Sequence, residues 1–303
     1  MLKPYHGHDA AQRPNIERRW FGDSPELYSK YVSSNSQCDV EPKYVTDDSW
    51  SYYFNSLGYR GEEFNPDARE IIYLCGCSHT FGSGIKWEQT FGYIFRELYC
   101  EYRNFRRDEV NLQNFSSIGA SNDYISRTVA TQLGCFRPSL VVVYFTSRTR
   151  KEYVKGQRII SLQPSLLSDS FATTRSGRGK LAIEASYDYY AYYTDEMGFI
   201  ETAKNMMLVK SLCENLDVPY IFVWQDFADL QNPKFTRNSI CKSFLDMIDC
   251  NRICSFSLRS MEIDSARDGI HCGPRTNELF AHALFRFFLD TQRTRGGNRA
   301  EPR

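Results

Sequence analysis

The segment Leu140–Phe145, which reads LVVVYF, constrains the fold of this chain more than any other stretch. Its residues are apolar in succession, without the alternation of a strand that has one face in water, so a strand here is covered on both faces. Two further runs, Glu70–Cys75 (EIIYLC) and Tyr220–Trp224 (YIFVW), have the same character, and Val110–Phe115 adds another candidate strand. Such runs are typical of the centre of a parallel sheet.

Segments with helical patterns separate these strands. Trp87–Tyr102 carries apolar residues at helical spacing, and Ser121 is a suitable N-cap for a helix that ends near Leu133. Thr202–Leu216 and Asn277–Leu289 also have helical patterns. The alternation predicts an α/β fold, a three-layer α/β/α sandwich with a central parallel sheet. Because ligands of such sheets bind beyond the carboxyl ends of the strands, we expect the chemistry in the residues that follow each strand.

The 303 residues divide into three parts by composition. Residues 1–66 are polar, aromatic and irregular, and we expect them to be an N-terminal extension that packs on the core. Residues 67–292 carry the strand and helix pattern of the main domain. Residues 293–303 are rich in Gly and Arg and are expected to be a flexible tail. Within the domain, the polar insert Lys151–Lys180 is expected to be a long loop or an irregular cap.

Charge and cysteine content exclude several functional classes. Lys and Arg together number 37, as do Asp and Glu, so the chain lacks the electrostatic footprint of a nucleic-acid or anionic-membrane partner. Met1–Gln12 has no apolar segment of the signal-peptide type, and no apolar run approaches the length of a membrane span. The ten cysteines are therefore expected to be reduced, and the expected compartment is the cytoplasm, with virion association open if the chain is phage-encoded.

Polar loops follow the predicted strands, at the positions where an α/β fold of this kind carries its catalytic residues. The loop after the first strand places Ser78 in a Gly-flanked turn, and the loop after the second strand carries Gly119, which lets a ligand approach the backbone closely. Near the C-terminus, Asp268 precedes His271 by three residues. A histidine can accept a serine proton while an aspartate holds its other ring nitrogen, so these residues are candidates for a serine-nucleophile site.

These loops resemble the sequence blocks of the SGNH (GDSL) hydrolase superfamily. GCSHTFG, Gly76–Gly82, resembles the nucleophile block, NFSSIGASND, Asn114–Asp123, resembles the second block, and DGIH, Asp268–His271, resembles the DxxH block. The stretch NSLGYRG, Asn55–Gly61, is similar to one found just before the first strand in bacterial and phage-borne members. The blocks stand in the family's order over residues 55–290. The resemblance implies a flavodoxin-like SGNH fold and hydrolysis of an acyl ester without metal or cofactor.

The resemblance also implies a role for each matching residue. Ser78 is implied to be the nucleophile, His271 its general base and Asp268 the group that orients His271. The backbone N–H groups of Ser78 and Gly119 are implied to be oxyanion donors. His79, beside Ser78, is expected to line the pocket and contact substrate, or to serve packing, rather than to act as a second base.

The sequence departs from the family pattern at two places. Cys77 stands where the nucleophile block has Asp, and Thr146–Arg150 (TSRTR) follows the central strand where the third block has Gly-x-Asn-Asp. The missing Asn is an oxyanion donor in the family, and loss of one such donor typically lowers the rate by about 10²–10³. Asn122, Arg148 or a hydroxyl of the same segment could replace it. We favour Arg148 as a substrate-binding residue, because an arginine pairs in bidentate fashion with a carboxylate or a phosphate.

The nucleophile block leaves two other chemistries to consider. Cys75, Cys77 and His79 form a C-x-C-x-H pattern, but no fourth ligand is evident, so no metal site is predicted. Cys77 could act as a nucleophile, but it lies one residue from the family position.

The function predicted from these features is hydrolysis of a small ester or an O-acyl group of a carbohydrate through an acyl-enzyme at Ser78. An O-acyltransferase with the same triad, and a catalytically weak SGNH-like binding or phage structural protein, are the alternatives. The ester and the oligomeric state are left open.

Overall fold

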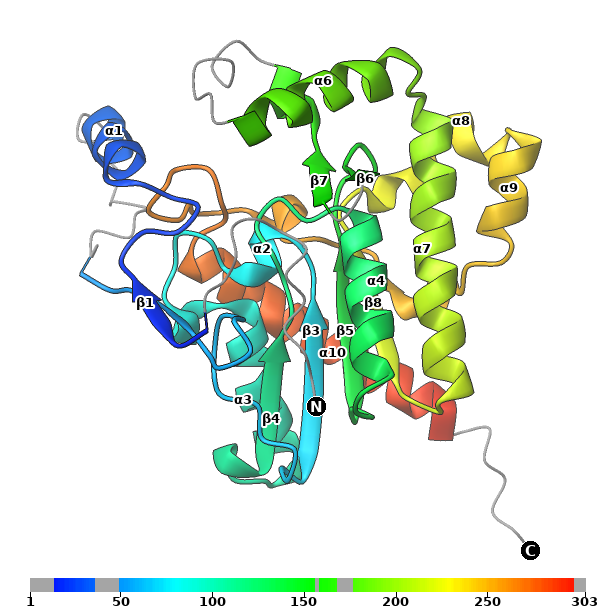
Figure 1. Cartoon of the computed structure of the whole chain (residues 1–303). Coiled ribbons are helices and arrows are strands. Elements are labelled where there is room, and N and C mark those ends of the chain that lie inside the picture. The colour runs from blue at the N-terminus through cyan, green and yellow to red at the C-terminus, as the bar shows by residue number, and fades with distance from the viewer. Residues whose placement is uncertain (1–13, 36–48, 156–157, 168–176, 297–303) are drawn as a thin grey trace, which may run out of the picture.

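Five parallel strands form one sheet at the centre of the computed structural model, which describes residues 14–35, 49–155, 158–167 and 177–296 (Figure 1). In spatial order they are β4 (Val110–Asn114), β3 (Glu70–Cys75), β5 (Leu140–Phe145), β8 (Tyr220–Trp224) and β9 (Ile253–Cys254). Counted along the chain this order is 2-1-3-4-5, the flavodoxin-like arrangement. The predicted parallel sheet is confirmed, and β9 escaped prediction because two residues are too short to carry a pattern.

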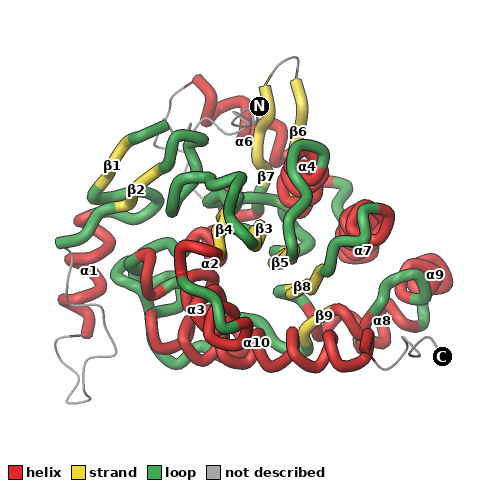
Figure 2. Tube along the Cα trace, turned by 90° about the horizontal axis from the view of Figure 1, so that it is seen from below, coloured by secondary structure: helices red, strands yellow, loops and turns green. Residues whose placement is uncertain are grey.

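Helices cover both faces of the sheet, as Figure 2 shows along the strands. One face packs against α4 (Asn122–Leu133) and α7 (Asp195–Asn215), and the other against α3 (Phe91–Arg103) and α10 (Pro274–Gly296). Successive residues of β3 enter different cores: Tyr73 and Cys75 face the α4 side, whereas Ile72 and Leu74 face the α3 side. Burial on both faces explains the continuous apolar runs, and the three-layer α/β/α sandwich is confirmed.

Short helices connect these elements. They are α2 (Ser78–Phe81), η1 (Trp87–Gln89), η2 (Arg107–Glu109), η3 (Pro164–Leu167), η4 (Phe227–Gln231), α8 (Pro233–Thr236), α9 (Ser239–Leu245), η5 (Cys250–Arg252) and η6 (Arg259–Met261). No helix in the described part of the chain is long and apolar enough to cross a membrane.

Helix ends follow the capping residues more closely than the apolar pattern does. Helix α4 begins after Ser121, whose hydroxyl accepts the Tyr124 N–H at 3.2 Å, as predicted. Helix α3 begins four residues later than predicted, because Thr90 caps it and the preceding turn is the 3-10 helix η1. Helix α10 continues to Gly296, so the first residues of the predicted tail are helical, while residues 297–303 lie outside the described part.

The insert that was expected to be a loop contains regular structure. Strands β6 (Lys151–Lys155) and β7 (Arg158–Leu162) pair as an antiparallel hairpin, and α6 (Gly177–Ala191) follows. Glu152 of the hairpin forms an ion pair with Arg127 of α4 at 2.7 Å. The hairpin thus docks through polar contacts, which an apolar pattern does not reveal. Residues 156–157 and 168–176 of the insert lie outside the described part.

The N-terminal segment packs beside α2, the short helix that begins at Ser78. Strands β1 (Ile16–Arg18) and β2 (Tyr52–Phe54) are antiparallel, and α1 (Pro25–Asn35) lies between them in sequence. Tyr52 and Phe54 pack on Phe81 of α2. Residues 1–13 and 36–48 lie outside the described part, so the interpretation of Met1–Gln12 is not addressed by the structure.

Candidate active site

The loops that carry the predicted site residues meet at the carboxyl edge of the sheet. The strand order reverses between β3 and β5, and open α/β sheets bind ligands at that point. The Ser117 N–H donates to the Gly76 carbonyl at 3.2 Å, which joins the loop after β4 to the loop after β3. Ser78 and Gly119 thus belong to neighbouring loops at this edge.

The turn that presents Ser78 requires glycine on both sides. A side chain on Gly76 would overlap Thr80, and Gly82 ends α2 in the left-handed conformation with φ of 81°. Ser78 is the first residue of α2 and is only 4% exposed. The backbone N–H groups at the start of a helix have no partner within it, so this turn offers donors beside the serine hydroxyl.

Asp268 holds the ring of His271 from one side. Its Oδ2 lies 2.6 Å from His271 Nδ1, and its Oδ1 accepts the backbone N–H groups of Ile270 and His271 at 2.9 and 3.0 Å. Burial acts to raise the pKa of Asp268, but the hydrogen bond and charge of His271 and these N–H groups outweigh it and lower the pKa. Asp268 is therefore an ionised orienting group, and Nε2 is the nitrogen that remains for proton transfer.

Two contacts bring the loop of Asp268 to the loop of Ser78. The Arg267 N–H donates to the Gly84 carbonyl at 3.1 Å, three residues after α2 ends. The ring of His79, next to Ser78 in sequence, lies edge-on to the ring of His271 with centroids 5.3 Å apart. The fold therefore places Ser78, Asp268 and His271 in one region, although 190 or more residues separate the serine from the other two.

Gly119 lies in an open part of the neighbouring loop. Its φ is 73°, and an added Cβ would meet no atom within 4 Å. Its carbonyl accepts the Ser161 hydroxyl at 2.8 Å, so the β6–β7 hairpin fixes the orientation of this peptide. The glycine thus leaves room for a ligand next to the backbone.

Asn122 does not have the free amide that an oxyanion donor needs. Its Nδ2 donates to the Thr146 carbonyl at 3.2 Å and to the Thr202 hydroxyl at 3.0 Å, and its Oδ1 accepts the Thr146 N–H at 2.8 Å. Both amide hydrogens are committed and the residue is 3% exposed. Asn122 instead ties the start of α4 to the end of β5 and to α7, which differs from the predicted role.

Arg148 is likewise engaged elsewhere. Its guanidinium lies 2.6 Å from Asp229, 3.3 Å from Asp195 and 3.4 Å from Asp226. Burial acts to lower the pKa of Arg148, but these three carboxylates outweigh it and raise the pKa. A guanidinium surrounded by three protein carboxylates has little capacity for a substrate anion, so we do not retain Arg148 as a substrate-binding residue.

The hydroxyls beside Arg148 have partners within the protein. Thr146 Oγ1 donates to Gln225 Oε1 at 3.5 Å, and Ser147 Oγ lies 3.1 Å from Thr149 Oγ1. Within Thr146–Arg150, the arginine that contacts the loop of Gly119 is Arg150, whose Nη1 donates to the Ala120 carbonyl at 3.3 Å. It lies two positions beyond the predicted residue, a shift that the sequence pattern could not resolve.

His79 is a neutral imidazole beside the candidate base. Burial, followed by the charges of His271 and Arg259, holds the pKa of His79 well below its usual value. Its Nδ1 is buried and has no hydrogen-bond partner among the described residues. The ring packs between His271 and Tyr144, with centroid distances of 5.3 and 6.3 Å. The ring of His79 thus packs directly against the ring of His271.

The cysteines of the nucleophile block are buried packing residues. Cys75 and Cys77 have no exposed surface, and burial raises the pKa of the Cys75 thiol. Within the described ranges, no group of three or more His, Cys, Asp or Glu side chains could hold a metal ion.

The N-terminal segment supplies a set of contacts that the sequence did not predict. Asp23 forms an ion pair with Arg267 at 2.6 Å, and both side chains are fully buried. Tyr52 Oη donates to Asp23 at 2.9 Å and accepts the Gly84 N–H at 2.8 Å. These three residues, which we call the brace, connect the loop after α2 to the residue that precedes Asp268. The one sequence feature that could have indicated these contacts is the position of Arg267 directly before the DxxH block.

Arg60 also supports the end of α2 and the loop that follows it. It donates to the carbonyls of Phe81, Gly82 and Ile85 at 2.9, 2.5 and 2.7 Å. Phe81 and Gly82 stand at the end of α2 and Ile85 in the loop that follows, so a buried arginine supplies hydrogen bonds to carbonyls that lie outside a continuing helix. Asn55–Gly61, the stretch that resembles a family segment, thus acts by supporting the nucleophile loop.

Comparison with known proteins gives matches at the level of structure. No protein-family model matches the chain, and no curated protein matches it by sequence. Among solved structures, the psychrotrophic esterase EstA from Pseudoalteromonas sp. is similar at 11% identity, with a TM-score of 0.42 over 74% of this chain and 99% of that chain. TesA is similar at 10% identity, with a TM-score of 0.43 over 72% of this chain and 98% of that chain.

A member of the lipolytic G-D-S-L family from Veillonella parvula DSM 2008 is similar at 9% identity, with a TM-score of 0.37 over 72% of this chain and 98% of that chain. The solved structures that match this chain thus include a member of the family whose sequence blocks the chain resembles. The overlap is partial at these TM-scores, and the function proposed below rests on the residues of this chain alone.

Proposed function

We propose that the chain is an SGNH-type esterase that hydrolyses acyl esters through an acyl-enzyme at Ser78. The observation that carries this proposal is the contact of 2.6 Å between Asp268 Oδ2 and His271 Nδ1, on a loop bonded to the turn that presents Ser78. A buried carboxylate that fixes one imidazole nitrogen leaves the other to act as a base, which is the arrangement that activates a serine.

The proposed reaction has two steps. His271 Nε2 takes the Ser78 hydroxyl proton while Oγ attacks the acyl carbon, and the imidazolium then gives that proton to the leaving alkoxide. Water, deprotonated by the same nitrogen, attacks the acyl-enzyme, and the carboxylic acid and Ser78 are released. Asp268 stays ionised and stabilises the imidazolium, which agrees with the lowering of its pKa.

The oxyanion is proposed to be bound by two backbone N–H groups, from Ser78 and Gly119. Gly119 supports this role because it combines a positive φ with open space beside its backbone. Asn122 and Arg148 are committed to other partners, so no side chain replaces the missing Asn of the family. We therefore expect a slower esterase than one with three donors, by about 10²–10³ in kcat.

His79 is proposed to contact the substrate through its ring edge. Its imidazole is neutral and lies directly against His271, so it adds a wall to the pocket without adding charge. The substrate class is proposed to be a small ester or an O-acyl group of a carbohydrate.

Labelling with a serine-directed fluorophosphonate tests the nucleophile. We expect covalent labelling of the full chain, lost in Ser78→Ala and retained in the neighbouring variant Cys77→Ser. Hydrolysis of p-nitrophenyl acetate should follow the same order. Absence of labelling in folded wild-type protein, or equal labelling of Ser78→Ala, would show that Ser78 is not an activated nucleophile.

A further inference from the structure

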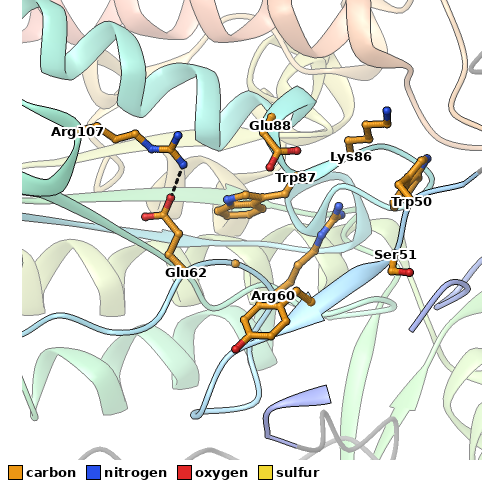
Figure 3. Close-up of a pocket in the computed structure, with 10 residues that line it drawn as sticks. Trp50, Ser51, Arg60, Glu62, Lys86, Trp87, Glu88 and Arg107 are labelled. Atoms are coloured by element: carbon orange, nitrogen blue, oxygen red, sulfur yellow. Dashed lines mark hydrogen bonds and ion pairs between the residues drawn. The ribbon is translucent and has the colours of Figure 1, made fainter. Parts of the chain in front are cut away.

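A pocket of about 490 Å³ lies between the N-terminal segment and the helix η1. Its lining comes from Trp50–Glu62 and from Lys86–Glu88, with Arg107 at one side (Figure 3). Ser78, Asp268 and His271 are not among its lining residues. The volume falls in the range of small-molecule sites, roughly 300–1,000 Å³.

One wall of the pocket is the indole of Trp87, which is held in a fixed position. A Cβ on Gly61 would lie 2.8 Å from Cζ2 of this ring, so the ring rests on the bare backbone of a glycine with φ of 122°. Tyr93 packs edge-on at 6.2 Å, and the Arg60 guanidinium carbon lies 6.0 Å from the ring centroid. Only glycine permits this approach, and the ring is in place before any ligand arrives.

A second indole, Trp50, is held by the brace. The guanidinium carbon of Arg267 lies 3.7 Å from its ring centroid, and Tyr52 packs edge-on at 4.9 Å. Figure 3 shows the Arg60 side chain rising between the two indoles. Two partly exposed, immobilised indoles leave apolar surface in contact with water within one cavity. Such surface is typical of a site that a ligand covers.

The polar lining restricts the class of ligand. Glu88 carries negative charge and Lys86 positive charge, and Glu62 and Arg107 line the pocket as an ion pair at 3.0 Å. The Arg60 guanidinium is committed to backbone carbonyls and is not among the groups that meet a ligand. An acyl chain would remove charged groups from water without replacing their hydrogen bonds, and a strongly anionic ligand would meet two carboxylates. A neutral molecule with flat C–H faces and a rim of hydroxyls fits both features, because hydroxyls donate to carboxylates and accept from cations.

We propose that this pocket binds a neutral saccharide and that it is a site separate from the Ser78 centre. The pyranose faces stack on Trp87 and Trp50, and the sugar hydroxyls bond to the charged rim. The proposal goes beyond the esterase function, since a saccharide held here needs no ester group.

Calorimetric titration with cellotetraose, xylotetraose and mannotetraose tests the site. The full chain carrying Ser78→Ala is used, so that the catalytic serine takes no part in binding. We expect at least one tetraose to bind, and Trp87→Ala in the same background to weaken its affinity by about tenfold or more, as removal of an aromatic anchor does. Trp87→Phe, which keeps an aromatic face, should weaken it less.

Matched controls separate this site from the rest of the surface. Tyr102 is 55% exposed and outside the pocket, so Tyr102→Ala should leave tetraose binding unchanged. Hydrolysis of p-nitrophenyl acetate should be equal in wild type and Tyr102→Ala, because Tyr102 belongs neither to the pocket nor to the loops that carry Ser78, Asp268 and His271. Adenosine is titrated as a flat ligand without a pyranose.

Three results would overturn the proposal. They are no binding of any tetraose at millimolar concentration, binding that Trp87→Ala and Trp87→Phe leave unchanged, and binding of adenosine in place of the tetraoses. Each of these leaves the labelling of Ser78 unaffected, so failure of the saccharide site and failure of the esterase proposal are distinguishable.

Discussion

The buried ion pair of Asp23 and Arg267 gives a test of how the N-terminal segment supports the site. Asp23→Asn keeps the shape of the side chain, and its amide oxygen can still accept the Phe21 N–H, but an amide nitrogen replaces the oxygen that accepts from Tyr52 and Arg267, and the charge opposite Arg267 is lost. Both side chains are fully buried and 2.6 Å apart, so the guanidinium keeps its charge without a counter-charge. Breaking such a pair typically costs about 3–5 kcal/mol of folding free energy.

The structure places the expected value at the lower end of that range. Arg267 still donates to the carbonyls of Arg19 and Trp50 and lies against the indoles of Trp20 and Trp50 at 4.1 and 3.7 Å. We therefore expect a loss of about 3 kcal/mol, which for a chain of 303 residues lowers the melting temperature by roughly 5 °C.

Thermal unfolding followed by circular dichroism measures this loss. The matched control is Asp108→Asn, which removes the carboxylate of the exposed pair Arg106–Asp108 and is expected to leave the melting temperature unchanged. In the double variant Asp23→Asn/Arg267→Gln the second change removes the stranded charge, so the two losses should be less than additive. A melting temperature of Asp23→Asn close to that of wild type, or strict additivity in the double variant, would refute this reasoning.

Three further predictions concern the site and its surroundings. Asp268→Asn should lower kcat for p-nitrophenyl acetate by about 10³–10⁴, because the amide no longer holds His271 in the required tautomer, and an unchanged kcat would contradict the role of Asp268. Gly119→Ala should lower kcat at least tenfold, because a non-glycine residue at φ of 73° strains the peptide that carries the proposed donor; its folding loss should stay near 1–2 kcal/mol in chemical denaturation, about the cost of one left-handed residue. Burial raises the pKa of Asp229 to about 6, although Arg148 acts to lower it. An unfolded Asp titrates near pH 4, so the folded state binds the extra proton between about pH 6 and 4 and the free energy of unfolding rises by about 1–3 kcal/mol as pH falls through that window. Urea unfolding should show this rise in wild type and not in Asp229→Asn, and the same pH slope in both proteins would assign the effect to another group.

Local patterns were sufficient for the four longer strands of the sheet and for the contact between Asp268 and His271. Leu140–Phe145 and Glu70–Cys75 form strands with the predicted bounds, because burial on both faces leaves a pattern within a few residues. Asp268 and His271 are three residues apart, so their contact also follows from local sequence.

Contacts between distant residues could not be predicted in this way. The amide of Asn122 is committed to Thr202, 80 residues away, and the guanidinium of Arg148 to Asp229, 81 residues away. The polar β6–β7 hairpin docks through Glu152 and Arg127 rather than through an apolar face. Each of these depends on which surfaces the completed fold brings together, and a single sequence carries no local sign of that.

The separation of 244 residues between Asp23 and Arg267 has a consequence for biosynthesis. Asp23 and Tyr52 leave the ribosome well before Arg267, Asp268 and His271. While the intervening residues are synthesised, Tyr52 and Asp23 lack their contacts with Arg267, and closing so long a loop is a slow step. A ribosome-stalled nascent chain that ends before Arg267 has no complete site, so any reactivity of Ser78 toward fluorophosphonate begins only once Asp268 and His271 have been synthesised.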